Sequence, residues 1–138
     1  MIIFLDIDGV LNQLQPGYYL DKTCIQNLSI LTKRLQAEVV LTSTWRLGYM
    51  HNRERCTPQV QKLLELFDEV GIVVQSRTKK LGDRKTEIEA YLEENEVTEY
   101  LVLDDDKREF PFGVPDNFYL VDGRLGLTKK DVQCILKR

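Results

Sequence analysis

Residues 2–9 read IIFLDIDG, an apolar run that ends in two aspartates and a glycine. An unbroken succession of apolar and β-branched side chains is typical of a strand that is buried on both faces. Such strands belong to parallel sheets, whose two faces are covered by helices. We therefore expect residues 2–7 to form a buried strand, with Asp6 and Asp8 near its carboxyl end.

The rest of the chain alternates helix-like and strand-like patterns. Helices are expected to start at capping residues and to repeat apolar positions every three or four residues. Strands separated by helices form βαβ units, so we predict an α/β three-layer sandwich with a Rossmann-like, mostly parallel sheet of about five strands and helices on both faces. The predicted strands are 2–7, 39–41, 71–74, 100–103 and 118–121, and the predicted helices are 21–36, one from Thr57-Pro58, 84–95 and one from Thr128.

Length and composition limit the possible classes of protein. A chain of 138 residues fits one domain, 1–138, and its net charge of −3 excludes a globally basic nucleic-acid coat protein. The three cysteines, 24, 56 and 134, are odd in number and far apart, which favours reduced thiols over a disulfide scaffold or a zinc site. No apolar run approaches the roughly 18 residues of a membrane span. We expect a cytoplasmic protein without a membrane partner, and a monomer is favoured.

Polar side chains follow three of the predicted strands. Asp6 and Asp8 follow the first, Thr42-Ser43 the second and Asp104-Asp105 the fourth. In open α/β sheets, ligands bind beyond the carboxyl ends of the strands. Acidic residues at strand ends also form turns and helix caps, but carboxylates gathered from separate strands repel one another without a cation. The pattern therefore predicts a site for Mg²⁺, which prefers oxygen ligands.

Four short motifs between residues 4 and 106 resemble those of the haloacid dehalogenase (HAD) superfamily of phosphatases and phosphotransferases. The first is FLDIDGVL at 4–11, and the second is a strand ending in Thr or Ser at 39–43. The third is a lysine that opens a later helix, best matched by Lys85, and the fourth is LVLDD at 101–105. The stretch LTSTWR at 41–46 also resembles the stand-alone HAD domains associated with RNA-repair systems. The resemblance implies a HAD fold and phosphoryl-transfer chemistry.

The resemblance also implies the catalytic roles of the first motif. Asp6 would be the nucleophile that forms an aspartyl-phosphate, and Asp8 would be the general acid and base. Mg²⁺ would be bound by the Asp6 carboxylate, the Asp8 backbone carbonyl, and Asp104 or Asp105, a choice that the sequence leaves open.

The other motifs imply the binding of the phosphoryl group. Thr42 and the backbone N–H of Ser43 would bind its oxygens, and Lys85 would offset the gathered negative charge. Lys79 and Lys80 are rival candidates for this lysine. Lys85 is preferred because Gly82-Asp83 marks a helix start and places Lys85 in the first turn.

Basic and aromatic residues near these motifs are candidate substrate contacts. Residues 77–85 carry five cations and one acid, a local charge of +4 that could steer a polyanion or simply be a solvated loop. Arg46 could clamp a phosphate, whereas Trp45 is expected to be buried. His51, the only histidine, is expected to be neither a metal ligand nor a catalytic base. Tyr18 and Tyr19 could form a lip of the site or anchor their loop.

The segments between the motifs are too short for the cap domain that larger HAD proteins insert. Residues 10–38 must supply a helix, and residues 46–84 must supply a helix, a strand and connections. We therefore predict a capless site, and an open site suits a phosphate on a macromolecule such as a nucleic-acid end.

The leading hypothesis is a phosphoric monoester hydrolase that uses Mg²⁺. The rival from another class is a receiver-like signalling module, which also uses an acidic pair, a hydroxyl and a lysine on a parallel sheet. Receivers carry the phospho-accepting aspartate at the third strand, whereas Val74-Gln75-Ser76 contains none. A phosphate-binding domain without turnover is a third possibility.

Overall fold

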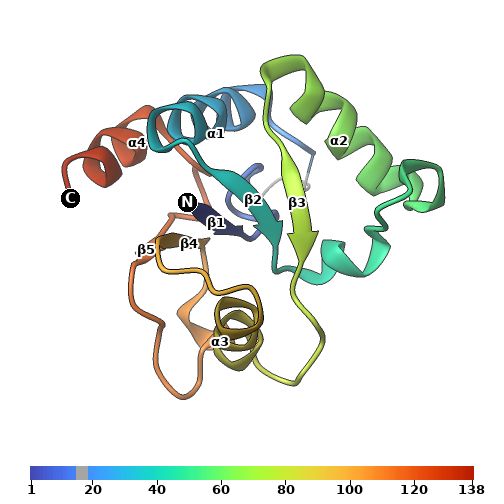
Figure 1. The fold of residues 1–138 in the computed structure, drawn as a ribbon. Helices are drawn as coiled ribbons and strands as arrows, with labels where there is room; N and C mark the ends of the chain where they lie inside the picture. The colour runs from blue at the N-terminus through green and yellow to red at the C-terminus, as the bar shows by residue number, and fades with distance from the viewer. Residues whose placement is uncertain (15–18) are drawn as a thin grey trace.

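The computed structural model describes residues 1–14 and 19–138. A five-stranded sheet in the order β3-β2-β1-β4-β5 forms its centre, and each pair of neighbouring strands is parallel (Figure 1). The strands are β1 (Ile2–Leu5), β2 (Glu38–Leu41), β3 (Val74–Arg77), β4 (Tyr100–Asp104) and β5 (Phe118–Leu120). The predicted α/β architecture with a mostly parallel five-stranded sheet is confirmed.

Helices cover both faces of this sheet. Figure 1 shows α1 (Lys22–Leu35), α2 (Pro58–Val70) and α4 (Lys129–Leu136) on one face and α3 (Arg84–Glu94) on the other. Three short 3₁₀ helices lie in the connections: η1 (Thr44–Gly48), η2 (Arg53–Arg55) and η3 (Lys107–Glu109). The three layers are therefore helix, sheet and helix, as predicted.

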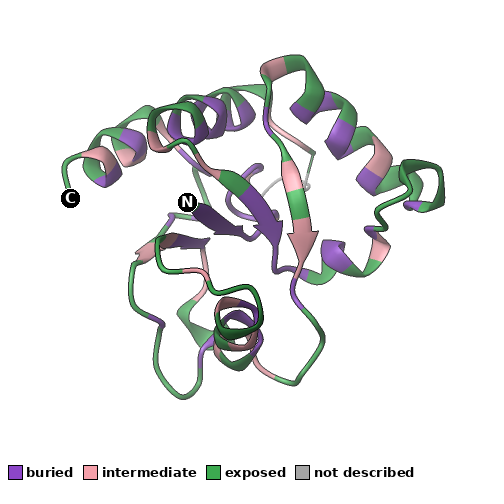
Figure 2. Ribbon diagram, in the orientation of Figure 1, coloured by how far each residue is buried: buried purple, intermediate pink, exposed green. Residues whose placement is uncertain are grey.

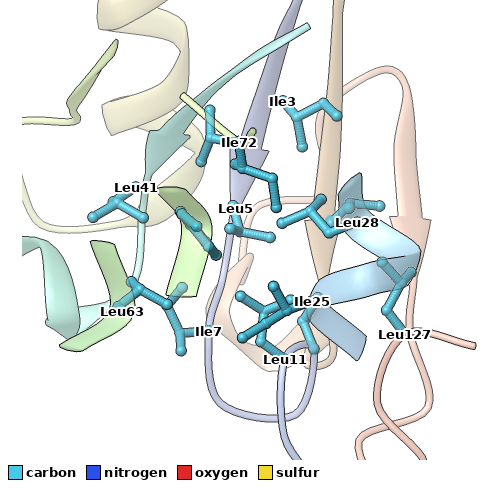
Figure 3. Packing of buried hydrophobic residues seen from close by; sticks show 14 of the residues in the cluster. Ile3, Leu5, Ile7, Leu11, Ile25, Leu28, Leu41, Leu63, Ile72 and Leu127 are labelled. Carbon is cyan, nitrogen blue, oxygen red and sulfur yellow. The ribbon is translucent and has the colours of Figure 1, made fainter. Parts of the chain in front are cut away.

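The side chains of β1 alternate between two hydrophobic clusters, one on each face of the sheet. Ile3 and Leu5 belong to the larger cluster, under α1, α2 and α4 (Figure 3), whereas Ile2 and Phe4 belong to the smaller one. All four residues are buried, and Figure 2 shows β1 as the buried centre of the sheet. Burial on both faces explains why this strand has no polar alternation.

Capping residues position the helices as the sequence predicts. The carboxylate of Asp21 accepts hydrogen bonds from the backbone N–H groups of Thr23 and Cys24. Thr57 caps α2, Asp83 caps α3, and Thr128 forms a capping box with Asp131 at α4. These side chains satisfy backbone N–H groups that have no partner inside a helix.

The prediction for the third strand was wrong by three residues. Gly71 ends α2 with a φ of 77°, a left-handed conformation that glycine adopts easily, and the strand begins only at Val74. Val74 aligns with Val39 of β2, and the strand continues through polar residues to Arg77. Because β3 lies at the edge of the sheet, its two faces are less covered and none of its four residues is fully buried, so the hydrophobic pattern placed the strand too early.

The three cysteines are free thiols, with Cys24 and Cys56 buried and Cys134 exposed. Among the residues that the structure describes, no helix is both long and apolar enough to cross a bilayer.

Candidate active site

The topology of the sheet places the ends of β1 and β4 at its switch point. The chain runs from β1 outward to β2 and β3, and then returns to the other side of β1 to form β4 and β5. Ligands of open α/β sheets bind in the crevice that forms where the strand order reverses. Asp6 directly follows β1, Asp104 ends β4, and the backbone N–H of Asp6 donates to the carbonyl of Leu103 at 3.0 Å.

Three carboxylates meet in this crevice. Oxygen atoms of Asp6, Asp104 and Asp105 all lie within 4.8 Å of one another. Asp6 is 4% exposed and Asp104 is 1% exposed. Burial, with the Asp104 carboxylate beside it, raises the pKa of Asp6 well above its ordinary value. Burial also raises the pKa of Asp104 to about 6, although the neighbouring Arg84 guanidinium acts in the opposite direction.

Arg84 supplies the positive charge that this group of carboxylates contacts. Its Nη1 lies 2.6 Å from Asp104 Oδ2 and 3.5 Å from Asp6 Oδ1, and its Nε lies 3.8 Å from Glu109 Oε2. Arg84 is the first residue of α3, directly after the capping Asp83. The start of α3 therefore delivers a guanidinium to the ends of β1 and β4.

Lys85, the preferred phosphate lysine, does not point to these carboxylates. Its Nζ lies 3.8 Å from Glu89 one turn further along α3. Consecutive helical residues are rotated by roughly 100°, so only one of Arg84 and Lys85 faces the sheet. Of the rival lysines, Lys79 pairs with Glu94 at 2.9 Å and Lys80 is exposed. The motif specifies a lysine, so the sequence analysis did not select Arg84. A cation directly after the N-cap of α3 is nevertheless placed where it can contact the carboxylates at the strand ends.

Asp8 lies outside the three-carboxylate group, and two N–H donors of the described residues hold its carboxylate. The indole Nε1 of Trp45 donates to Asp8 Oδ2 at 3.2 Å, and Asn12 Nδ2 donates to Asp8 Oδ1 at 3.0 Å. Asn12 is itself oriented, because its Oδ1 accepts the backbone N–H of Gly9 at 2.7 Å. These contacts fix the direction of the Asp8 side chain.

Gly9 allows Asp105 to come close to the loop after β1. Its φ is +85°, and a Cβ at this position would lie 2.2 Å from Asp105 Oδ2. Gly123 presents a similar opening, where a Cβ would lie 2.7 Å from the same oxygen. Two glycines therefore make the space that the Asp105 carboxylate occupies.

The segment after β2 is held in place from beneath. Thr42 and Ser43 are buried at the end of β2, and the backbone N–H of Thr42 donates to the carbonyl of Leu5 at 3.1 Å. Arg46 Nη1 donates to the carbonyls of Thr42 at 2.8 Å and Ser43 at 3.0 Å, and its Nη2 lies 3.0 Å from Glu87 Oε2. The guanidinium of Arg46 thus supports this segment, and these three partners lie outside the carboxylate group.

Of the remaining candidate substrate contacts, some are buried and others are exposed. Trp45 is buried, as expected, and its additional bond to Asp8 is not apparent from the sequence. His51 is exposed, and its ring packs edge-on against Tyr49. Tyr19 is 84% exposed, whereas Tyr18 lies outside the described residues.

The donor set of the carboxylate group fits a hard divalent cation. Its ligand atoms are all oxygens, and the buried carboxylates of Asp6 and Asp104 lie so close together that their ionised forms repel one another without a nearby cation. Mg²⁺ takes oxygen ligands and is usually held by one or two carboxylates together with water and phosphate. The residues present therefore suit Mg²⁺.

The sheet is parallel, carboxylates lie at its switch point, and the DxDG and DD motifs lie at the ends of neighbouring strands. Together these features define a HAD-type domain, a phosphatase-like class of protein. The match to a family model is more specific. Residues 2–132 match the family described as "HAD domain in Swiss Army Knife RNA repair proteins", and the chain belongs to this family. Neither the curated proteins nor the solved structures include a match to the chain.

Proposed function

We propose that this protein hydrolyses a phosphate monoester through an aspartyl-phosphate on Asp6, with Mg²⁺ as cofactor. The observation that carries the proposal is the pairing of two different carboxylate environments two residues apart. Asp6 is buried beside Asp104 and Asp105, whereas Asp8 is partly exposed and held by Trp45 and Asn12. One environment suits a nucleophile in a charged centre, and the other suits a proton donor at its edge.

The reaction would proceed in two displacements at phosphorus. An oxygen of Asp6 attacks the phosphorus, the bond to the leaving oxygen breaks, and Asp8 gives that oxygen a proton. Asp8 then takes a proton from water, which attacks the same phosphorus and releases inorganic phosphate and the free Asp6 carboxylate. The donors on Asp8 keep its carboxyl aimed during both steps.

Asp6, Asp104 and Asp105 would hold Mg²⁺, which supplies charge neutralisation for the phosphoryl oxygens. The Asp8 backbone carbonyl remains a further candidate ligand. Arg84 takes the role that the sequence assigned to Lys85, because its guanidinium is the cation that contacts Asp6 and Asp104. Thr42 and the N–H of Ser43 stay the candidate phosphate donors, and Arg46 positions them through their carbonyls.

We further propose a nucleic-acid end as the substrate. The description of the family associates it with RNA repair. Between β1 and α1 the described residues form no helix or strand, and between β2 and β3 they form only η1, η2 and α2. These elements fit a capless domain, whose open site suits a phosphate at the end of a macromolecule.

The test is hydrolysis of a chromogenic aryl phosphate, followed by a panel of 5′- and 3′-phosphorylated oligonucleotides. We expect turnover with Mg²⁺, loss with EDTA and loss in Asp6→Asn. Asp8→Asn is expected to accumulate a phosphorylated protein, detected as one added phosphoryl group by mass spectrometry of the quenched reaction. Activity that survives in Asp6→Asn would contradict the mechanism. A stable phosphoprotein in the wild type, without release of phosphate, would instead favour the receiver-like alternative.

A further inference from the structure

A cavity of about 450 Å³ lies at the carboxyl ends of β2 and β3, the same edge of the parallel sheet as the proposed active site. One wall is the segment after β2, including Leu47, Met50 and His51, and the other is the segment after β3, including Arg77, Lys79 and Lys80. Figure 1 shows these segments leaving neighbouring strands, and Arg77 Nη1 joins them by donating to the carbonyl of Arg46 at 2.8 Å. We call this cavity the β2–β3 groove.

The charges of the β2–β3 groove all have one sign. Arg77, Lys79 and Lys80 line it, and no Asp or Glu of the described residues does. Within the described part of the chain, Lys79 has Glu94 as an ion-pair partner, but Arg77 and Lys80 have no carboxylate within 4.0 Å. In a protein with a net charge of −3, this is a local concentration of positive charge, which attracts anions.

The opposite wall offers contacts for a flat, partly apolar group. Met50 is 43% exposed, Leu47 is 50% exposed, and the exposed His51 ring is braced edge-on by the buried Tyr49. Nucleic-acid bases bind on such surfaces by stacking and apolar contact, largely independently of the nucleotide sequence. A positive wall facing an apolar and aromatic wall suits a nucleotide, which carries a phosphate and a flat base.

Lys80 connects the β2–β3 groove to the active site. It also lines a second depression, whose other charged residues are the cations Arg46, Arg84 and Arg108 and the acids Asp83, Glu87 and Glu109. Arg84 in turn contacts Asp104 and Asp6. A strand whose terminal phosphate is bound at Asp6 can therefore continue past Lys80 into the groove.

We infer that the β2–β3 groove binds the nucleotides next to the end phosphate of a single-stranded nucleic acid. Their backbone phosphates lie against Arg77 and Lys80, and a base lies against His51 and Met50. The inference rests on the proposed function for what occupies Asp6, but the binding itself does not require turnover.

The experiment compares two double variants that remove the same charge. Lys79→Ala/Lys80→Ala removes two lysines of the groove, and Lys33→Ala/Lys62→Ala removes two exposed lysines of α1 and α2. Fluorescence anisotropy measures binding of a labelled single-stranded decanucleotide with a terminal phosphate, as RNA and as DNA, over a range of salt concentrations. All proteins carry Asp6→Asn, so that hydrolysis does not consume the probe.

We expect the groove variant to bind about tenfold more weakly. Its salt dependence should flatten by about 0.7 in log–log slope for each phosphate that the removed lysines no longer neutralise. The control variant should bind like its parent, and His51→Ala should weaken binding by about fivefold without changing the salt slope. Equal binding by the groove and control variants would overturn the inference, as would tighter binding of a phosphopeptide than of either oligonucleotide.

The two proposals fail in different ways. If the wild type hydrolyses aryl phosphate but the groove variant binds oligonucleotides normally, the groove inference is wrong and the proposed function stands. If the groove variant loses oligonucleotide binding while the wild type hydrolyses no phosphate monoester, the groove inference stands and the proposed function is wrong.

Discussion

The indole Nε1 of Trp45 donates a hydrogen bond to the carboxylate of Asp8 at 3.2 Å, joining the segment after β2 to the loop after β1. The two residues are 37 positions apart in the sequence. The bond gives a buried tryptophan a direct part in orienting the proposed general acid and base. The orientation of Asp8 in the first motif therefore depends on Trp45, which lies just after the second motif.

Replacing Trp45 with Phe tests this dependence, because it keeps an aromatic ring and removes the N–H. We expect kcat for an aryl phosphate to fall about tenfold with little change in KM, since Asp8 loses one of its two donors and is aimed less well. An unchanged kcat would show that the Trp45 N–H is not needed to orient Asp8.

The carboxylate group predicts stabilisation by magnesium. At a Mg²⁺ concentration of about 100 times Kd, binding to the folded protein adds about 2.7 kcal/mol, which corresponds to a rise in Tm of about 10 °C. Asp105→Asn should greatly reduce this rise, and EDTA should reverse it. Asp122→Asn is the control, because Asp122 is paired with Arg124 on the surface. Equal Mg²⁺ responses of the two variants would exclude Asp105 as a ligand.

Gly9→Ala should disturb the same centre through a steric effect. The new Cβ would lie 2.2 Å from Asp105 Oδ2 and would push this carboxylate away. Gly113→Ala is a matched control, since Gly113 also has a positive φ, +104°, but its Cβ would meet no described atom within 4 Å. Both variants carry the backbone strain of about 1–2 kcal/mol, so only Gly9→Ala should lose the Mg²⁺ response. A preserved Mg²⁺ response in Gly9→Ala would contradict this account.

The buried pair of Arg46 and Glu87 predicts a large loss of stability when one partner is removed. Both side chains are less than 10% exposed, and Glu87 also accepts the backbone N–H of Leu81 at 2.9 Å. Glu87→Gln leaves the Arg46 charge uncompensated and should lower the free energy of unfolding by about 3 kcal/mol. Asp68→Asn breaks the exposed pair with Arg53 and should cost less than about 1 kcal/mol. Urea unfolding of both variants measures the difference.

Cys24 predicts resistance to alkylation and a pH limit on stability. Burial raises the pKa of its thiol to about 11, so the folded state keeps it protonated at pH values where the unfolded chain, with a thiol pKa of about 8.5, ionises. The stability that Cys24 contributes is therefore complete below about pH 8.5 and is lost as the pH rises toward 11. At pH 8, iodoacetamide should label the exposed Cys134 and leave Cys24 unmodified. Mass spectrometry of digested protein measures this, and rapid labelling of Cys24 in the folded protein would contradict it.

The fold could be predicted from the sequence wherever local pattern and burial agree. The uninterrupted apolar run of β1 and the caps at Asp21, Thr57 and Asp83 each determine an element from neighbouring residues alone. The prediction was wrong at β3, because the faces of this edge strand are incompletely covered and the polar residues Gln75 and Ser76 remain at least partly exposed. Hydrophobic pattern does not distinguish such a strand from the connection before it.

By itself, the sequence determined the class of fold and the carboxylates of the site, because strand ends are local features and parallel strands place their carboxyl ends at one edge. Only the tertiary structure decided which cation faces Asp6 and Asp104. Arg84 and Lys85 are adjacent in the chain, but the rotation of α3 against the sheet directs the first inward and leaves the second to Glu89. It likewise decided that Trp45 orients Asp8 and that Arg46 supports Thr42, because these contacts depend on how β1, β2 and α3 pack together.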